Sequence, residues 1–266
     1  MTTRDGAWYD AMYNNRELVP DHPAFFSRWD ALSREARETN PCELDVRYGQ
    51  GEGDTLDVFP APQGDAPVLV FIHGGYWRSL DKKDHSFIAP AFTRHGACVV
   101  VPNYALCPAV TIPQITAQVA RAVAWTWHNI ARFGGDRRRI VVAGHSAGGQ
   151  LAAMMLACLW QQLDTSLPRD TVRNALAISG LHDLDPLMRT TFLQPVIKLT
   201  PEQVANASPA RISAPRQGTL YTVAGALESA EYHRQNRLIQ EAWGARRVPV
   251  CELLPGLHHF SILEAM

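Results

Sequence analysis

The chain has 266 residues, of which 46% are hydrophobic, and a formal net charge of −1 at pH 7. This is enough apolar sequence to bury a full core, and one domain spanning residues 1–266 is the simplest organisation. The basic residues are scattered, and the densest run, residues 137–139, is expected in a solvated loop before a strand, so a nucleic-acid partner is not expected.

Targeting and redox features of the sequence favour the cytoplasm. No apolar run approaches the roughly 18 residues of a membrane span, and the polar N-terminus leads into no apolar segment, so neither secretion nor a membrane partner is expected. The five cysteines are odd in number and form no CxxC pair. We therefore expect them to be small buried apolar residues in a reducing compartment.

Residues 1–45 are rich in aromatic and charged side chains and are predicted to form a helical arm. The spacing of Phe25, Trp29 and Ala36 fits one face of an amphipathic helix, which Pro41 is expected to end. We expect the arm to pack on the main domain. An arm that overhangs the active site is the alternative.

From residue 44 onward, predicted strands and helices alternate. Two short alternating runs predict an antiparallel hairpin at a sheet edge, at 44–48 and 55–59. Further strands are predicted at 68–72, 98–101, 140–143, 175–179, 219–224 and 248–253. Helices are predicted at 113–133, 151–157 and 230–243, and a short cap or insertion at 181–209. The alternation predicts the α/β class, with a mostly parallel central sheet flanked by helices.

A Gly-x-Ser-x-Gly motif at residues 144–148 lies between a predicted strand and a predicted helix. A serine on such a sharp turn has strained backbone angles that crowd the residues two before it and two after it, and both are glycine here. The turn would lift the hydroxyl of Ser146 above the sheet and direct the N–H of Ala147 toward the same space. Ser146 is therefore predicted to be a nucleophile.

A serine nucleophile needs a base, and the base needs a carboxylate partner. In an open parallel sheet such groups gather at the carboxyl ends of the strands, where this sequence places Asp183, Glu228, His258 and His259. Glu228 is preferred as the acid because it follows the later strand, and Asp183 is the alternative. Because His258 and His259 are adjacent, only one of them can face Ser146.

A His-Gly-Gly-Tyr-Trp loop follows the first predicted buried strand. Backbone N–H groups of Gly74, Gly75 and Ala147 would form an oxyanion hole, which stabilises negative charge developing on a carbonyl oxygen. Tyr76 and Trp77 are predicted to form the wall of a substrate pocket, suited to a flat aromatic substrate. Core packing is the alternative for Trp77.

The order of glycine loop, serine, acid and histidine suits an α/β hydrolase, and the motifs resemble those of the arylformamidases, also called kynurenine formamidases. The resemblance rests on the HGGxW loop, the serine turn, the acid loop and the closing segment, at 73–77, 144–149, 227–235 and 256–260. Residues 13–16 and 206–209 are also similar. In the family the catalytic histidine directly precedes Phe, which selects His259, whereas animal and yeast members are best known with aspartate at the position of Glu228.

The resemblance implies an α/β-hydrolase fold and a serine hydrolase that converts N-formyl-L-kynurenine to L-kynurenine and formate, in tryptophan degradation. It implies Ser146, Glu228 and His259 as the catalytic residues, a formyl-serine intermediate, and neither a metal nor an organic cofactor. The nearest alternative is a general carboxylesterase acting on short-chain acyl esters. A metal-dependent hydrolase is disfavoured because no HExxH spacing occurs, and a non-enzymatic binding protein because the whole catalytic set is present. The sequence does not determine the oligomeric state, and a homodimer is one of the states that it allows.

Overall fold

The structure is a computed structural model and describes residues 4–266. These residues contain an eight-stranded sheet with the order β1-β2-β4-β3-β5-β6-β7-β8. The strands are β1 (Glu43–Arg47), β2 (Thr55–Phe59), β3 (Ala66–Ile72), β4 (Cys98–Pro102), β5 (Gly135–His145), β6 (Asn174–Ile178), β7 (Thr219–Gly225) and β8 (Val250–Leu254). β2 pairs antiparallel with β1 and β4, and all other neighbouring strands are parallel. The predicted edge hairpin and mostly parallel sheet are confirmed.

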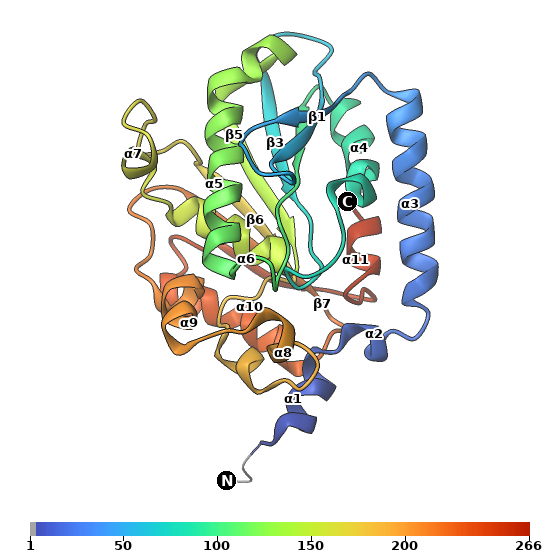
Figure 1. The fold of residues 1–266 in the computed structure, drawn as a ribbon, viewed down its shortest axis with the longest axis vertical. Helices are drawn as coiled ribbons and strands as arrows, with labels where there is room; N and C mark the ends of the chain where they lie inside the picture. Colours follow the sequence, from blue (N-terminus) through green and yellow to red (C-terminus); the bar gives the residue numbers. More distant parts are fainter. Residues whose placement is uncertain (1–3) are drawn as a thin grey trace.

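Helices cover both faces of the sheet (Figure 1). The helices are α1 (Gly6–Tyr13), α2 (Asn15–Leu18), α3 (His22–Thr39), α4 (Ala89–Thr93), α5 (Ile112–Asn129), α6 (Ala147–Ala157), α7 (Trp160–Leu163), α8 (Gln194–Ile197), α9 (Pro201–Ala207), α10 (Ala230–Trp243) and α11 (Ser261–Glu264). Short 3₁₀ turns lie at Lys82–Ile88, Ile130–Phe133, Asp185–Arg189 and Pro209–Arg211. Among the described residues, no helix is both long and apolar enough to span a bilayer.

The apolar pattern of β3 explains why the sheet is covered on both faces. Successive side chains of a strand point to opposite faces. Val68 and Val70 belong to the core cluster that includes α5, α6 and α10, whereas Leu69 and Phe71 belong to the cluster that includes α3, α4 and α11. A strand that is apolar on both faces therefore needs a helical layer on each side.

Two boundaries differ from the prediction. The helix predicted at 113–133 leaves α-helical geometry at Asn129 and continues as a 3₁₀ turn to Phe133, after which Gly134 adopts a left-handed φ of 82°. β5 begins as early as Gly135, which pairs with Ala66 before an irregularity in the register. The basic run 137–139 therefore lies on an exposed part of a strand, and the expectation of a loop there is wrong.

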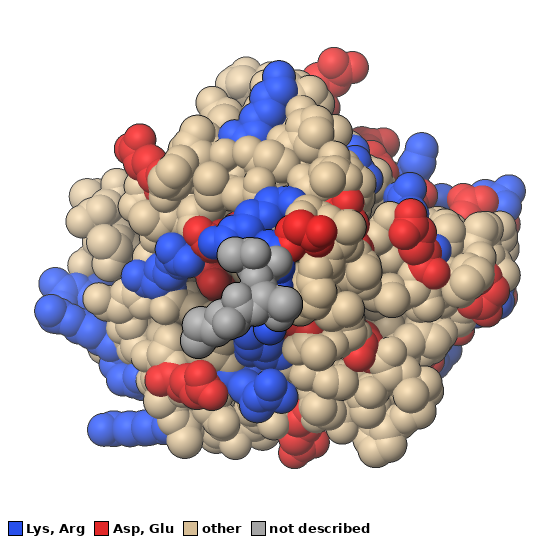
Figure 2. All heavy atoms as spheres, turned by 90° about the horizontal axis from the view of Figure 1, so that it is seen from below, with Lys and Arg blue, Asp and Glu red and all other residues tan. Residues whose placement is uncertain are grey.

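The N-terminal arm and the 181–209 segment meet at the end of the sheet where the parallel strands finish (Figure 1). The backbone N–H of Thr191 donates to Asp10 of α1 at 2.7 Å, and Arg189 donates to the hydroxyl of Tyr9 at 2.6 Å. Figure 2 views the molecule from this end, where Lys and Arg side chains gather near the centre of the face beside Asp and Glu side chains. Two additions to the α/β layers thus cover the edge at which functional groups are expected.

All five cysteines are free. Cys98 and Cys107 are buried, and the other three are partly buried. Burial raises the pKa of the Cys107 thiol to about 11, so this group stays protonated at neutral pH.

Candidate active site

Ser146 is the only residue between the last residue of β5 and the first residue of α6, and it has φ 57° and ψ −116°. This conformation is strained for a residue with a side chain. It is held by the sheet, because the N–H of Ser146 donates to the carbonyl of Ile178 at 2.8 Å. The Ser146 side chain lines a pocket at the carboxyl edge of the sheet.

The two glycines of the serine turn are required by close backbone approach. A Cβ on Gly144 would lie 2.1 Å from the carbonyl oxygen of Gly148, and a Cβ on Gly148 would lie 2.1 Å from that of Ile72. Neither backbone atom can move without breaking the turn or the sheet. The close contacts confirm the steric reason for glycine at both positions.

His259 and Glu228 lie in contact behind the serine. The Nδ1 of His259 is 2.7 Å from Oε2 of Glu228, and both side chains are at most 5% exposed. The other carboxylate oxygen accepts hydrogen bonds from the Ser179 hydroxyl at 2.5 Å and from the Gly225 N–H at 2.7 Å. A carboxylate that accepts from Nδ1–H leaves Nε2 as the basic nitrogen. His259 lines the same pocket as Ser146.

The two alternatives from the sequence lie elsewhere. The carboxylate of Asp183 accepts a hydrogen bond from Arg211 at 2.8 Å and lies 3.9 Å from a nitrogen of Arg234. His258 is partly exposed, and its ring lies 5.0 Å from that of Phe25 in an edge-to-face arrangement. Neither residue is in the contact between Glu228 and His259.

His145 holds the histidine loop in place. Its Nε2 lies 2.8 Å from the carbonyl oxygen of His259, and the two rings are 4.6 Å apart. Burial, with a contribution from the neighbouring His259, holds the pKa of His145 well below its usual value, so the ring is neutral. A carbonyl only accepts, so the neutral ring carries its proton on Nε2. This partner lies 114 residues away in the sequence.

The orientation of the glycine loop supports an oxyanion hole. The carbonyl oxygens of His73 and Gly74 both accept from the Tyr104 hydroxyl in the core, at 2.9 and 3.2 Å. In a trans peptide the following N–H points the opposite way, so the N–H groups of Gly74 and Gly75 are directed away from the core. Gly74 is also close to Ser146, since a Cβ added there would lie 3.2 Å from the Cβ of Ser146.

Ala147 supplies the third N–H of the expected oxyanion hole. It is the first residue of α6, and its side chain is fully buried. The first N–H groups of a helix have no partner within the helix and carry the positive end of its dipole. This end of α6 therefore favours an oxyanion beside Ser146.

Tyr76 and Trp77 point in different directions. Both have positive φ, 52° and 55°, which turns the chain sharply. Tyr76 lines the pocket, whereas the fully buried Trp77 donates from its indole N–H to Gln150 of α6 at 3.1 Å. The expectation that Trp77 forms part of the pocket wall is not met, and its core-packing alternative describes the geometry.

The pocket has a cavity volume of about 50 Å³. Part of its wall comes from the N-terminal arm, through Asn14, Asn15, Arg16, Phe26 and Trp29. The 181–209 segment contributes Phe192. The arm therefore both packs on the domain and overhangs the site, which combines the two alternatives drawn from the sequence.

A hydrogen-bonded chain joins the arm to α10 and to the glycine loop. Asn15 donates to the Tyr232 hydroxyl at 2.8 Å, the Tyr232 and Tyr76 hydroxyls are 2.7 Å apart, and Tyr76 donates to the Tyr13 carbonyl at 2.5 Å. Burial raises the pKa of Tyr232, while contacts with Tyr76, Asn15 and the Ser146 side chain oppose that rise. Tyr232 lies in the 227–235 segment of the resemblance, but the sequence assigned it no role, because its partners Asn15 and Tyr76 are far away in the chain.

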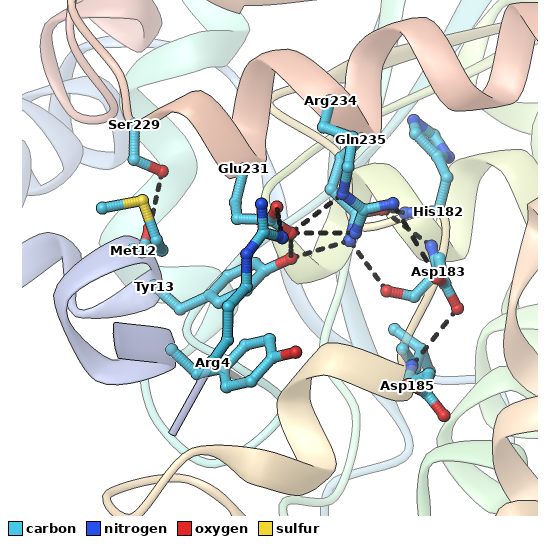
Figure 3. Close-up of polar contacts among 12 residues, drawn as sticks. Arg4, Met12, Tyr13, His182, Asp183, Asp185, Ser229, Glu231, Arg234 and Gln235 are labelled. Atoms are coloured by element: carbon cyan, nitrogen blue, oxygen red, sulfur yellow. Dashed lines mark hydrogen bonds and ion pairs between the residues drawn. The ribbon is translucent and has the colours of Figure 1, made fainter. Parts of the chain in front are cut away.

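A second polar network anchors the arm to α10 (Figure 3). The Tyr13 hydroxyl donates to Glu231 at 2.7 Å and accepts from Gln235 at 3.1 Å. Ser229 follows Glu228 directly in the sequence, and its hydroxyl donates to the Met12 carbonyl at 2.6 Å. These hydrogen bonds connect the arm to the loop that carries Glu228 and to the N-terminal part of α10.

No cluster of three or more His, Cys, Asp or Glu side chains within residues 4–266 is arranged to hold a metal ion.

Comparisons with known proteins agree with this architecture. The family model BD-FAE matches residues 56–197. The kynurenine formamidase of Danio rerio is 32% identical over 239 residues, covering 87% of this chain and 79% of that protein, whereas esterase LipC of Mycobacterium tuberculosis is 32% identical over 52% of this chain and 35% of its own length. The crystal structure of a provisionally named thioesterase from Silicibacter sp. has a TM-score of 0.85 at 30% identity, over 96% of this chain and 93% of that one. The α/β-hydrolase fold and the resemblance noted in the sequence are confirmed, and the chain belongs to the kynurenine formamidase family of α/β hydrolases.

Proposed function

We propose that this hydrolase cleaves the formamide bond of N-formyl-L-kynurenine, giving L-kynurenine and formate. The observation that carries the proposal is that Ser146, His259 and the glycine loop open into one pocket, in a chain related to kynurenine formamidases over most of its length. Tyr76 at the pocket supplies an aromatic surface for an aryl formamide.

In the first step, Ser146 Oγ attacks the formyl carbon while His259 Nε2 takes the hydroxyl proton. Glu228 holds the ring by its Nδ1–H and stabilises the imidazolium. The negative charge passes to the formyl oxygen, which accepts hydrogen bonds from the N–H groups of Gly74, Gly75 and Ala147.

In the second step, the C–N bond breaks as His259 gives its proton to the leaving aryl nitrogen, which leaves formyl-Ser146 and the free arylamine. Water then loses a proton to His259 and attacks the formyl carbon. The second tetrahedral species expels the serine oxygen, which recovers the proton, and formate leaves. These steps use neither a metal nor an organic cofactor.

A carboxylesterase acting on short-chain acyl esters is the second candidate, favoured by the relation to esterase LipC. The two activities separate by measuring kcat/KM on N-formyl-L-kynurenine and on 4-nitrophenyl acetate. Amides are intrinsically less reactive than activated esters, so a formamide value equal to or above the ester value marks specific recognition. A formamide rate at background, with the ester cleaved, would make the esterase the function.

The nucleophile is tested with Ser146→Ala. Activity on both substrates is expected to fall by roughly ten-thousandfold or more, as in other serine hydrolases. Gly64→Ala is the matched control, because a Cβ there meets nothing within 4 Å. Turnover by Ser146→Ala equal to that of the wild type would contradict the mechanism.

The setting of the reaction is part of the proposal. Hydrolysis of N-formyl-L-kynurenine is a step of tryptophan degradation. Five free thiols support a reducing compartment, and we place the enzyme in the cytoplasm. Separation of cell fractions followed by the formamidase assay tests that location.

A further inference from the structure

The charged residues of the pocket are all of one sign. Arg16 and Arg78 line it, and no Asp or Glu within residues 4–266 does so. The Glu228 carboxylate lies behind His259 and is engaged by the imidazole, a serine hydroxyl and a backbone N–H. A pocket that holds two guanidinium groups and no carboxylate lacks a partner for its positive charge.

Arg78 lies in the loop after the two glycines, and its side chain is anchored on Phe192 of the 181–209 segment. One of its terminal nitrogens donates to the carbonyl of Phe192 at 2.9 Å, and its guanidinium carbon lies 5.6 Å from the centre of that ring. An arginine has five N–H donors, so this anchor leaves others for a ligand. The planar group is therefore held in place without being neutralised.

Arg16 approaches from the arm. It belongs to α2, it is exposed, and its guanidinium carbon lies 5.5 Å from the centre of the Phe26 ring. Its neighbour Asn15 is buried and bonds Tyr232, so the backbone that carries Arg16 is fixed relative to Ser146.

The two arginines differ from others at the same end of the molecule. Arg189 and Arg211 pair with carboxylates at 3.0 and 2.8 Å, whereas neither Arg16 nor Arg78 pairs with one in the part of the chain that the structure describes. Burial, and next the positive charge of Arg16, lower the pKa of Arg78. An anion between them would relieve that repulsion.

We propose that Arg16 and Arg78 form a carboxylate-binding subsite that selects substrates with a carboxylate on the leaving-group side of the acyl bond. The inference rests on the proposed hydrolysis at Ser146 and deepens it. The acyl carbon lies at the serine, the aromatic ring against Tyr76, and the carboxylate at the two guanidinium groups. The substrate class is an N-formyl or O-acyl aryl compound whose arylamine or phenol carries a carboxylate side chain.

The test compares each substrate with a neutral twin. N-formyl-L-kynurenine is paired with its carboxamide, and an acetyl ester of 3-hydroxyphenylpropanoate with the corresponding amide. The measured quantity is the carboxylate preference, defined as the ratio of kcat/KM for the acid to kcat/KM for its twin. Arg16→Gln and Arg78→Gln are each expected to lower this ratio roughly tenfold or more, because a charge-assisted hydrogen bond is lost.

Two further variants separate charge from structure. Arg78→Lys keeps the charge and is expected to retain part of the carboxylate preference. Arg246→Gln, at an exposed position outside the pocket lining, is expected to leave the preference unchanged.

Inhibition by two anions tests which anion the arginines bind. Benzoate is the carboxylate probe and inorganic phosphate is the competing anion, and stronger competitive inhibition by phosphate than by benzoate would assign the two arginines to phosphate. Equal falls on the acid and its twin, or no fall, would overturn the subsite.

The ester pair keeps this test independent of the proposed function. If the wild type cleaves both esters but no formamide, the formamidase proposal fails while the ester ratio still reports on the arginines. If it cleaves N-formyl-L-kynurenine and its carboxamide equally well, the formamidase proposal stands and the subsite fails.

Discussion

The serine turn and the N-terminal arm border the same pocket but are specified in different ways. The turn depends on close backbone contacts, such as the approach of Gly148 in the first turn of α6 to Ile72 at the end of β3. The arm depends on side-chain hydrogen bonds over long separations, such as Tyr13 to Glu231 across 218 residues. Steric exclusion permits almost no substitution in the turn, whereas each bond of the arm contributes about 1 kcal/mol and can be removed singly.

After the loss expected in Ser146→Ala, the largest effect comes from the acid. Glu228→Gln keeps the side-chain shape but loses the charge that stabilises the imidazolium, so kcat/KM is expected to fall roughly 10³- to 10⁴-fold. Asp183→Asn is the matched control, because Asp183 contacts arginines and not His259. Steady-state kinetics on N-formyl-L-kynurenine measure both. A larger fall in Asp183→Asn than in Glu228→Gln would reverse the assignment of the acid.

The next effect concerns the turn itself. Gly148→Ala places a Cβ 2.1 Å from the carbonyl of Ile72, and the free energy of unfolding is expected to fall by roughly 3 kcal/mol or more, with activity lost. Gly64→Ala, in open space, is expected to change stability by less than about 0.5 kcal/mol. Urea denaturation of both variants provides the comparison. Equal stabilities would remove the steric account of the motif.

A smaller effect is expected in the arm. Tyr13→Phe removes the bonds to Glu231 and Gln235, and the free energy of opening the arm is expected to fall by about 1–3 kcal/mol. Hydrogen exchange of the amides in α1 and α2 should accelerate, while exchange in α6 stays unchanged. Tyr221→Phe, at an exposed position of β7, is the control. Uniform acceleration across α6 as well would mean that turn and arm unfold as one unit.

The smallest effect is a pH dependence. Burial lowers the pKa of both His85 and His182 to about 3, against about 6.5 in the unfolded chain. Below pH 6.5 the unfolded state therefore binds more protons, and each group is expected to lower the free energy of unfolding by up to about 1.4 kcal/mol per pH unit until the folded pKa near 3.

His182 offers the sharper check of this dependence, because neither of its ring nitrogens has a hydrogen-bond partner within residues 4–266. His182→Phe should flatten the decline measured by urea denaturation between pH 7 and pH 5. His95→Phe, at an exposed position, should not. A decline that is just as steep in His182→Phe would place its cause at other groups.

The sequence was informative wherever a local rule applied. Alternating apolar residues in β3 and the glycines around Ser146 act through their own neighbours, so the strands, the nucleophile turn and the α/β class could be predicted. The pairing of Glu228 with His259 could be favoured but not decided, because Asp183 also follows a parallel strand. The error at residues 137–139 has the same origin. A charged run is taken for a loop unless the pairing of the flanking Gly135 and Ile140 with β3 is known.

The pocket wall was decided by the tertiary structure. Asn15 and Arg16 lie in a segment that resembles the family but had no predicted role. They line the pocket because α1 and α2 pack on α10, where Asn15 donates to Tyr232. Trp77 entered the core for a similar reason, because α6 presents Gln150 to its indole N–H. The strained serine turn has a local sequence signature, because its backbone angles require glycine at fixed positions. The direction of a side chain depends instead on partners that only the folded chain brings near.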